Sequence, residues 1–320
     1  MLSAAYGVEV VYNGEGSPDD PVGGGHLGDW DHQGGRSHPR RRRMARRGFR
    51  IWLVVMVAVV ATVVVVVARG PSKSPEHPVA VPAPLSVVQS ATHVPQSVLD
   101  TIGEGSATNR VLPVENAPFL SQDGLPLVVY VGSEFCPYCA AQRWALVIAL
   151  SRFGRFSKLS VAQSATSDVY PRLSSFSFFD STYTSSYLRF DPVEQYSNTA
   201  GPDGAFLPLE PLGRQVHALV ARFDREPYAG RSSAPPGTFP FVDIANRFLQ
   251  IGSGFPPGAL VGQGLTAISQ ALSVPSSPIA QAVDGAANGL VAAICSVDGH
   301  RPRWVCTSSA AAEGRMLIGN

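Results

Sequence analysis

The longest uninterrupted apolar stretch of the chain lies in its first quarter. Residues 51–68 carry no charge, and Thr62 is their only polar residue. As a helix rising about 1.5 Å per residue, they would extend about 27 Å, close to the hydrocarbon thickness of a bilayer. The pattern therefore predicts a single transmembrane helix over residues 51–68.

Beyond residue 95 the apolar pattern becomes that of an α/β domain. The apolar run 125–132 is rich in β-branched residues and predicts a buried strand. Residues 138–153 place apolar side chains along one surface of good helix formers, which predicts a helix that Gly154 ends. A short second strand is expected at 159–162.

The second half of the chain adds further strands and helices. Residues 163–200 partly alternate aromatic residues with Ser and Thr, which predicts two strands with a hairpin turn at Asp180-Ser181. The other expected elements are helices at 96–102, 211–223, 257–272 and 278–295, and strands at 239–245 and 248–251. This order predicts an α/β fold with an insertion between the second strand and the strand at 239–245.

Charge indicates how the predicted membrane helix is oriented. Eight arginines lie between Arg36 and Arg50, against only Arg69 and Lys73 on the far side of the apolar run. Lys and Arg beside a span favour the cytoplasmic side. We therefore expect a single-pass protein of the cell membrane with a cytoplasmic N-terminus and an extracytoplasmic C-terminal domain. A cleaved signal peptide, which has a shorter apolar core, is the alternative.

Composition divides the chain into four parts. Residues 1–50 are rich in Gly, Asp, His and Arg without apolar periodicity, and we expect a disordered cytoplasmic segment before the helix. Residues 69–95 contain six prolines and predict an extended linker. Residues 96–320 then form the extracytoplasmic domain. Because Met44 opens a basic segment typical of a signal anchor, we hypothesise that translation begins there.

Two of the four cysteines, Cys136 and Cys139, stand between the predicted strand and helix. Unpaired N–H groups and the positive end of a helix dipole stabilise a thiolate at such a position. Cys139 lies about one helical turn beyond Cys136 and can attack a mixed disulfide formed there. Pro137 suits the first helical turn, because it loses no needed N–H. Half of a zinc site and a buried structural disulfide are the alternatives.

The order strand, CxxC motif, helix, strand resembles the thioredoxin-like fold. In detail, the chain resembles an uncharacterised family of membrane-anchored thioredoxin-like proteins from actinobacteria and some archaea, which has a domain of unknown function and a Cys-Pro-Tyr-Cys motif. The stretches that carry the resemblance are 134–146, 150–154, 168–171, 181–185, 277–282, 293–295 and 305–306. The resemblance implies the fold and a redox role but names no substrate.

The resemblance to thioredoxin-like proteins also implies a substrate groove. Such folds begin the strand opposite the CxxC motif with a cis-proline, and Phe239-Pro240 stands in that position. The expected groove residues are Pro240 (cis), Phe239, Pro137 and Tyr138. A trans proline that starts an edge strand is the alternative. Glu134 is a candidate proton shuttle, with a solvated loop carboxylate as the alternative.

Tyr130 distinguishes this chain from thioredoxins. Thioredoxins carry a buried acid six positions before the first cysteine, and here that position is Tyr130. Since the acid helps to deprotonate the second cysteine, its replacement favours a disulfide donor or isomerase over a reductase.

The other two cysteines, Cys295 and Cys306, predict a structural disulfide. All four cysteines lie on the predicted outer side, where disulfides persist. Asp298-Gly299 can turn the chain back between the pair. Closing a loop of this size restricts the unfolded chain by roughly 2–3 kcal/mol. A relay that passes electrons to or from Cys136 and Cys139 is the alternative.

The expected function is that of a membrane-tethered extracytoplasmic thiol–disulfide oxidoreductase that forms or isomerises disulfides in exported proteins. The expected partners are exported protein thiols, the membrane through residues 51–68, and a membrane redox partner of open identity. No metal or cofactor is expected. No nucleic acid is expected either, because topology and anionic lipid account for the arginine block. The alternative is a non-catalytic thioredoxin-like binding or scaffold protein of the cell envelope, with the aromatic segment 176–190 as its binding surface.

Overall fold

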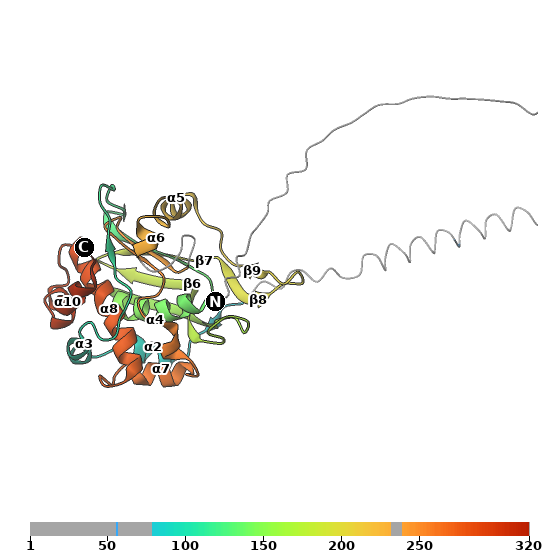
Figure 1. Ribbon diagram of the computed structural model, residues 1–320, viewed down its shortest axis with the longest axis horizontal. Helices are drawn as coiled ribbons and strands as arrows, with labels where there is room; N and C mark the ends of the chain where they lie inside the picture. Colours follow the sequence, from blue (N-terminus) through green and yellow to red (C-terminus); the bar gives the residue numbers. More distant parts are fainter. Residues whose placement is uncertain (1–55, 57–78, 232–238, 320) are drawn as a thin grey trace, which may run out of the picture. The chain divides into compact units, whose positions relative to one another are not determined.

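The computed structural model describes residues 56, 79–231 and 239–319. Within the compact unit Pro75–Asn320, the described residues form a mixed α/β domain with several sheets (Figure 1). The predicted disordered segment 1–50 and, apart from Met56, the predicted transmembrane helix 51–68 lie outside the described residues.

Strands and helices of very different lengths make up the domain. Its strands are β1 (Val81–Pro82), β2 (Leu112–Pro113), β3 (Ser121–Gln122), β4 (Leu125–Gly132), β5 (Gly154–Gln163), β6 (Ser174–Ser185), β7 (Arg189–Glu194), β8 (Tyr196–Ala200), β9 (Phe206–Pro208), β10 (Phe241–Ile244) and β11 (Phe248–Ile251). Its helices are α2 (Leu85–Thr92), α3 (Gln96–Ile102), α4 (Pro137–Ser151), α5 (Arg214–Phe223), α6 (Tyr228–Arg231), α7 (Leu265–Ala271), α8 (Pro278–Val297), α9 (Arg303–Cys306) and α10 (Ser309–Gly314), with 3-10 turns η1 (Pro257–Leu260) and η2 (Arg315–Leu317).

Strand β4 is central to the main sheet. The strand order is β2-β11-β10-β4-β3, and β7 also pairs with β4. β10 runs antiparallel to both β4 and β11, whereas β7 runs parallel to β4, with Gly132 opposite Glu194. This parallel pair brings the end of β7 beside the segment that leaves β4 for α4.

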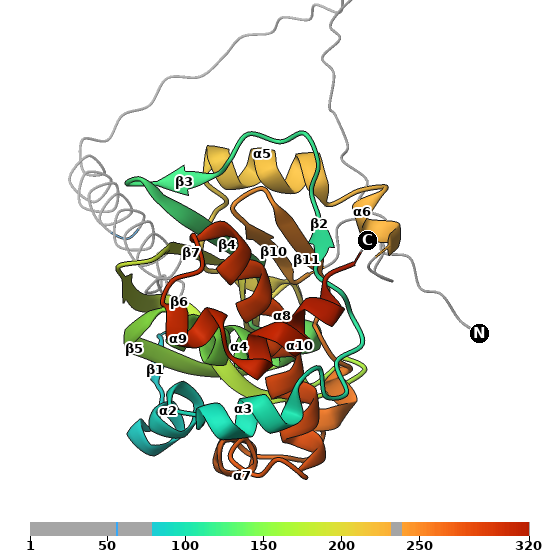
Figure 2. The same cartoon turned by 90° about the vertical axis from the view of Figure 1, so that its left-hand side faces the viewer.

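The two faces of β4 contribute to two separate cores. Successive side chains of a strand point to opposite faces. Val128 and Tyr130 pack into the core shared with α4 and α8, whereas Val129 and Val131 pack into the core shared with α5. The sheet therefore has α5 on one face and α4 with α8 on the other (Figure 2).

The strand that follows α4 does not join the main sheet, contrary to a simple strand–helix–strand unit. β5 pairs antiparallel with β1 and with β6 in a separate sheet. The predicted hairpin turn at Asp180-Ser181 is wrong, because β6 continues through these residues. Asp180 has a φ of +57°, and the β5–β6 register shifts beside it. The turn-forming residues thus produce a bulge inside a long strand.

The domain begins earlier than predicted. Residues 79–95 were expected to belong to an extended linker, but they form β1 and α2. Val87 and Ala91 of α2 are buried in the α4 core. The prolines did not prevent this helix, because Pro84 stands at its N-cap, where no intrahelical N–H bond is required.

The C-terminal helices differ from the prediction in one respect. The expected helix 257–272 is divided into η1 and α7, with Gly262 at a φ of +75° between them. In contrast, α8 is continuous over Pro278–Val297. Among the described residues, α8 is the one helix long and apolar enough to cross a membrane, but 83 % of its apolar window is buried in the domain. A core helix meets the same criterion, so α8 is weak evidence for a span.

Candidate redox site

The CxxC motif lies at the start of α4. Cys136 is the N-cap residue, with extended backbone angles (φ −78°, ψ 124°), and Pro137 is the first helical residue. The backbone N–H of Cys139 donates a hydrogen bond to the Cys136 sulfur at 3.3 Å. The sulfur thus takes the place of a capping oxygen and accepts from an N–H that the helix leaves free.

The segment before β10 lies against this helix start. The peptide bond between Phe239 and Pro240 is cis. The thiol of Cys136 faces the carbonyl oxygen of Phe239, with 3.8 Å between sulfur and oxygen. Since β10 pairs with β4, the sheet register brings these residues together across more than a hundred positions of sequence.

The two motif cysteines are free thiols, and neither is well exposed. Cys136 retains 7 % of its accessible surface and Cys139 none. Of the expected groove residues, Tyr138 is 39 % exposed, whereas Pro137 and Pro240 are buried. The arrangement therefore offers Tyr138 to solvent and largely covers Cys136.

The two thiols differ in acidity. Burial opposes ionisation of Cys136, but hydrogen bonds from the side chain and backbone of Cys139 and the positive charge of Arg143 outweigh it, so the pKa of Cys136 lies below its usual value. Burial and the hydrogen bond to Cys136 raise the pKa of Cys139 well above its usual value. An acidic first thiol and a weakly acidic second thiol are the pairing that a nucleophile and a resolving cysteine require.

Aromatic rings surround the motif on two sides. Phe135 stacks on Phe206 with 4.3 Å between ring centroids and lies 6.4 Å from the ring of Tyr196. On the other side, Tyr138 meets Tyr170 edge to face at 6.2 Å. The β8–β9 hairpin and the loop before β6 thus form part of the surface beside Cys136.

Glu134 lies inside the protein and is not a solvated loop carboxylate. It is 9 % exposed, and its Oε1 accepts a hydrogen bond from the Ser177 hydroxyl at 2.7 Å. Burial raises its pKa, although the Ser177 bond acts in the opposite direction. Its backbone N–H donates to the carbonyl oxygen of Tyr196 at 2.9 Å. The carboxyl is therefore held in the protein interior, two residues before Cys136.

A buried ion pair lies beneath the motif. Arg143 donates from Nε to Glu194 at 2.7 Å and from Nη2 at 3.1 Å, and neither side chain has accessible surface. Burial disfavours the charged guanidinium, but Glu194 overrides this and the pKa of Arg143 lies well above its usual value. The only local sequence signal was that Arg143 lies four residues after Cys139, on the same helix face.

Tyr130 fills the space beside the ion pair. It has no accessible surface, and its ring meets Phe178 edge to face at 5.1 Å. Burial raises its pKa well above the usual value, although the charge of Arg143 acts in the opposite direction. The side chain is therefore a neutral phenol, so it supplies no negative charge beneath Cys139.

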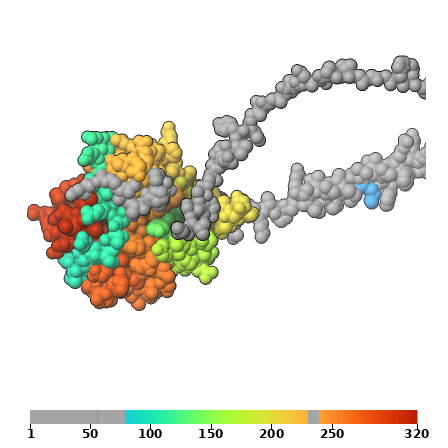
Figure 3. Space-filling model, viewed as in Figure 1, coloured from blue at the N-terminus to red at the C-terminus, as the bar shows by residue number. Residues whose placement is uncertain are grey.

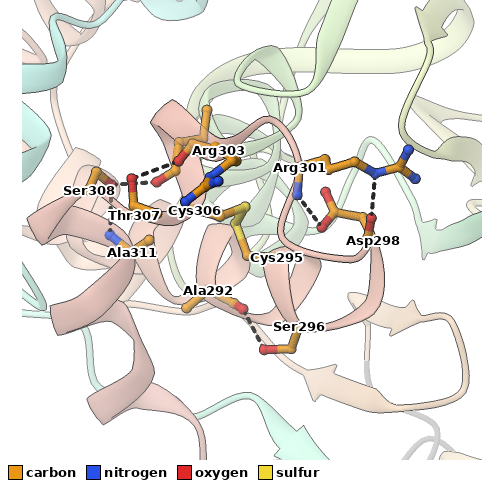
Figure 4. Close-up of a disulfide and its surroundings, with 11 residues drawn as sticks. Ala292, Cys295, Ser296, Asp298, Arg301, Arg303, Cys306, Thr307, Ser308 and Ala311 are labelled. Carbon is orange, nitrogen blue, oxygen red and sulfur yellow. Dashed lines mark hydrogen bonds between the residues drawn. A yellow bond between two sulfur atoms is a disulfide. The ribbon is translucent and has the colours of Figure 1, made fainter.

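Cys295 and Cys306 form a disulfide between the end of α8 and α9, with 5.5 Å between their Cα atoms (Figure 4). They cannot complete a zinc site with the motif cysteines, because their sulfurs are bonded to each other. In the space-filling view, the α9–α10 segment lies at one end of the domain (Figure 3).

The C-terminal disulfide lies far from the motif. Trp304, two residues before Cys306, covers Arg152, whose guanidinium is 4.8 Å from the ring centroid. Arg152 ends α4, and Cys136 begins it. A helix of this length spans about 22 Å. The geometry therefore gives the disulfide no direct contact with the motif and does not support the relay alternative.

The aromatic segment 176–190 does not form the exposed surface expected of a binding face. Phe176 and Phe178 are 0 % and 2 % exposed. The Phe176 ring packs against Trp144 of α4 at 4.6 Å, and Phe178 packs against Phe190 at 5.1 Å. These side chains belong to the core around α4, because β6 lies against that helix.

The comparisons with known proteins show the family of the chain. Residues 110–296 match a family described as Domain of unknown function (DUF929). This match covers more than half of the chain, so the chain belongs to that family. No curated protein and no solved structure matches the chain.

Proposed function

We propose that this protein is a thiol–disulfide oxidoreductase in which Cys136 is the nucleophile and Cys139 the resolving cysteine. The observation that carries the proposal is the 3.3 Å hydrogen bond from the Cys139 N–H to the Cys136 sulfur at the start of α4. A helix N-terminus and N–H donors stabilise a thiolate in this position. The pKa of Cys136 below its usual value agrees with this role.

A thioredoxin-like fold is part of the proposal. Its support is the parallel β4–β7 pair, the α4 helix that leaves the end of β4, and the antiparallel β10–β11 pair. The contact between Cys136 and the carbonyl oxygen of Phe239, next to Pro240, agrees with the expected substrate groove. The β5–β6 sheet and the β8–β9 hairpin would then be the insertion.

The proposed reaction moves two electrons and two protons between cysteine pairs. In the oxidising direction, a substrate thiolate attacks the Cys136 sulfur of a Cys136–Cys139 disulfide, and Cys139 leaves as a thiolate that takes up a proton. The second substrate thiolate then attacks the substrate sulfur of the mixed disulfide and releases Cys136. The substrate gains a disulfide and the protein becomes a dithiol. In isomerisation, Cys136 attacks a substrate disulfide and is released again without net oxidation.

Single-turnover refolding tests this reaction directly. The full-length chain, oxidised beforehand and freed of oxidant, is mixed in stoichiometric amounts with a reduced, unfolded disulfide protein. We expect about one substrate disulfide per chain and loss of this transfer in Cys136→Ser. The matched control is Cys295→Ala with Cys306→Ala, which removes the distant pair and should retain the transfer. Equal transfer by Cys136→Ser and the wild type would contradict the proposal.

The burial of Cys136 favours a second candidate function, that of a non-catalytic binding or scaffold protein. A cysteine with 7 % exposure is poorly placed for attack on a folded substrate. Under this alternative, the reduced Cys136 thiol would resist alkylation until the chain unfolds. Its binding surface would have to lie outside the core aromatics of β6, for example at the exposed Tyr138 and Tyr196, which are 39 % and 40 % exposed.

We also propose that the domain is tethered outside the cytoplasm by residues 51–68, with exported protein thiols as substrates and a membrane redox partner. The arginines before the apolar run support this orientation. Protease treatment of intact cells and of lysed cells tests it. We expect the protease to digest the domain in intact cells. Without protease, we expect the chain to remain in the membrane fraction. Protection of the domain in intact cells would contradict the orientation.

A further inference from the structure

The guanidinium of Arg143 is attached to the turn that carries Cys136. Its Nη2 donates to the carbonyl oxygen of Ser133 at 2.7 Å. The same carbonyl oxygen accepts the backbone N–H of Cys136 at 3.2 Å. Arg143 and the backbone of the nucleophile thus share one acceptor. A movement of the guanidinium would be transmitted to the turn between β4 and α4.

The position of Arg143 on α4 also directs it toward both motif cysteines. It follows Cys139 by four residues and Cys136 by seven, which places all three on one side of the helix. Its positive charge favours ionisation of both thiols. Because the pair is buried, solvent screens this charge less than it would a surface charge.

Glu194 holds the guanidinium through two hydrogen bonds, from Nε at 2.7 Å and from Nη2 at 3.1 Å. Its Oε1 also accepts the backbone N–H of Phe178 at 3.2 Å, and its own backbone N–H donates to Glu210 at 2.9 Å. β6 therefore fixes the carboxylate, and the segment after β9 fixes the backbone of Glu194. Its negative charge opposes ionisation of Cys139, so the two members of the ion pair act on the motif in opposite directions.

The other ionisable groups near the motif do not supply the same charge. Tyr130 is a buried phenol with a pKa well above its usual value, because burial disfavours its anion. Burial likewise raises the pKa of Glu134, and a carboxyl carries no positive charge in either protonation state. Among the ionisable groups that act on the Cys136 thiol, Arg143 is the positive one.

A contribution to stability alone is a weak explanation for the burial of this ion pair. A buried ion pair gains little net stability over well-packed apolar residues, because both charges lose their hydration. We propose that Arg143, held by Glu194, is a positioning residue that fixes the turn before Cys136 and promotes reaction of its sulfur in thiol–disulfide exchange. This inference rests on the proposed function only in taking the reaction to be thiol–disulfide exchange. The reactivity of the Cys136 thiol itself can be measured without a substrate.

Two variants of the same ion pair test the inference, since they should shift Cys136 in opposite directions. The reduced full-length chain is treated with iodoacetamide over a range of pH, and mass spectrometry follows alkylation of the Cys136 peptide. Arg143→Met removes the positive charge and should move the inflection upward by about one pH unit, about a tenfold loss of thiolate near neutral pH. Glu194→Gln leaves the guanidinium uncompensated and should move the inflection downward.

Further variants separate charge from packing. Arg143→Lys retains a positive charge without the planar fork and should stay closer to the wild type than Arg143→Met. Asp180→Asn, which breaks the exposed ion pair with Lys158, is the matched control and should leave the inflection unchanged. If Arg143→Met does not fold, the comparison of Arg143→Lys with Glu194→Gln remains decisive, because only Glu194→Gln should move the inflection downward.

The outcomes also separate this inference from the proposed function. Shifts of Arg143→Met and Glu194→Gln in the same direction, or no shift in either, would overturn the inference and leave a structural pair. Opposite shifts in a chain that fails the refolding assay would support the role of Arg143 in thiol reactivity while the oxidoreductase proposal fails. If the chain refolds substrate but neither variant shifts the inflection, the oxidoreductase proposal is supported and the role of Arg143 fails.

Discussion

The backbone N–H of Cys139 donates to the sulfur of Cys136 from 3.3 Å, while the thiol of Cys139 has no accessible surface. One residue therefore stabilises the anion of the other and is itself shielded. This asymmetry follows from the start of α4, where the first N–H groups have no helical acceptor. It assigns the two cysteines different chemical behaviour.

Cys136 should be alkylated faster than Cys139 in the reduced, folded chain. The pKa of Cys136 is lowered and that of Cys139 is raised, and only the thiolate reacts. We expect the alkylation rate of Cys136 to inflect below the pKa of an unperturbed cysteine. Peptide mass spectrometry after timed quenching checks this. An inflection of Cys136 above that value, or faster labelling of Cys139, would be the contrary result.

Removal of the C-terminal disulfide should destabilise the domain without abolishing thiol exchange. The bridge joins residues 11 apart in sequence, and the chain-entropy model assigns about 3 kcal/mol to a loop of this size. Cys295→Ala with Cys306→Ala should lose about this much in urea unfolding. The same variant should retain the exchange rate of the Cys136 pair. A large loss of exchange in a folded double variant would revive the relay alternative.

Asp243 should make the domain less stable as the pH rises. Burial raises its pKa from 3.8 to about 7, although the N–H of Asn246 acts in the opposite direction. Between about pH 4 and pH 7 the folded state therefore binds more protons than the unfolded chain, so stability falls across this window. Across the whole window the free energy of unfolding should fall by about 4 kcal/mol, at 1.36 kcal/mol per pH unit.

Asp243→Asn should flatten this dependence. The amide oxygen can still accept the 2.8 Å bond from the Asn246 N–H, while no carboxylate forms above neutral pH. Urea unfolding at several pH values measures the effect, with the exposed Asp203→Asn as the matched control. A wild type whose stability rises from about pH 4 to pH 7, with Asp243→Asn showing the same slope, would refute the assignment.

Gly132→Ala should destabilise the end of β4. A Cβ at this position would lie 2.1 Å from the hydroxyl oxygen of Tyr130 and 2.5 Å from its Cζ. Overpacking of this kind costs about 1–3 kcal/mol. The loss should shrink in a Tyr130→Leu background, as a double-mutant cycle can measure. Gly264→Ala, whose added Cβ meets nothing within 4 Å, is the control, and an equal loss there would contradict the steric explanation.

Local sequence patterns determined the parts of the fold that depend on neighbouring residues. The apolar run 125–132 sets the bounds of β4, and the helix that follows Pro95 has the predicted bounds of α3. β11 also begins and ends where the pattern placed it. Cys136 at the start of α4 followed from the same local reasoning, because a helix start is defined by adjacent residues. Prolines misled the prediction where they cap α2, since the same residues occur in linkers and at helix starts.

Only the tertiary structure decided which strand lies beside β4 and which groups surround the motif. Arg143 and Glu194 are 51 residues apart in sequence, and β7 brings them together by pairing in parallel with β4. The exposure of Cys136, the burial of Glu134 and the packing of Phe176 also depend on elements distant in the chain. Periodicity reports which face of an element is apolar, but long-range pairing determines what that face contacts.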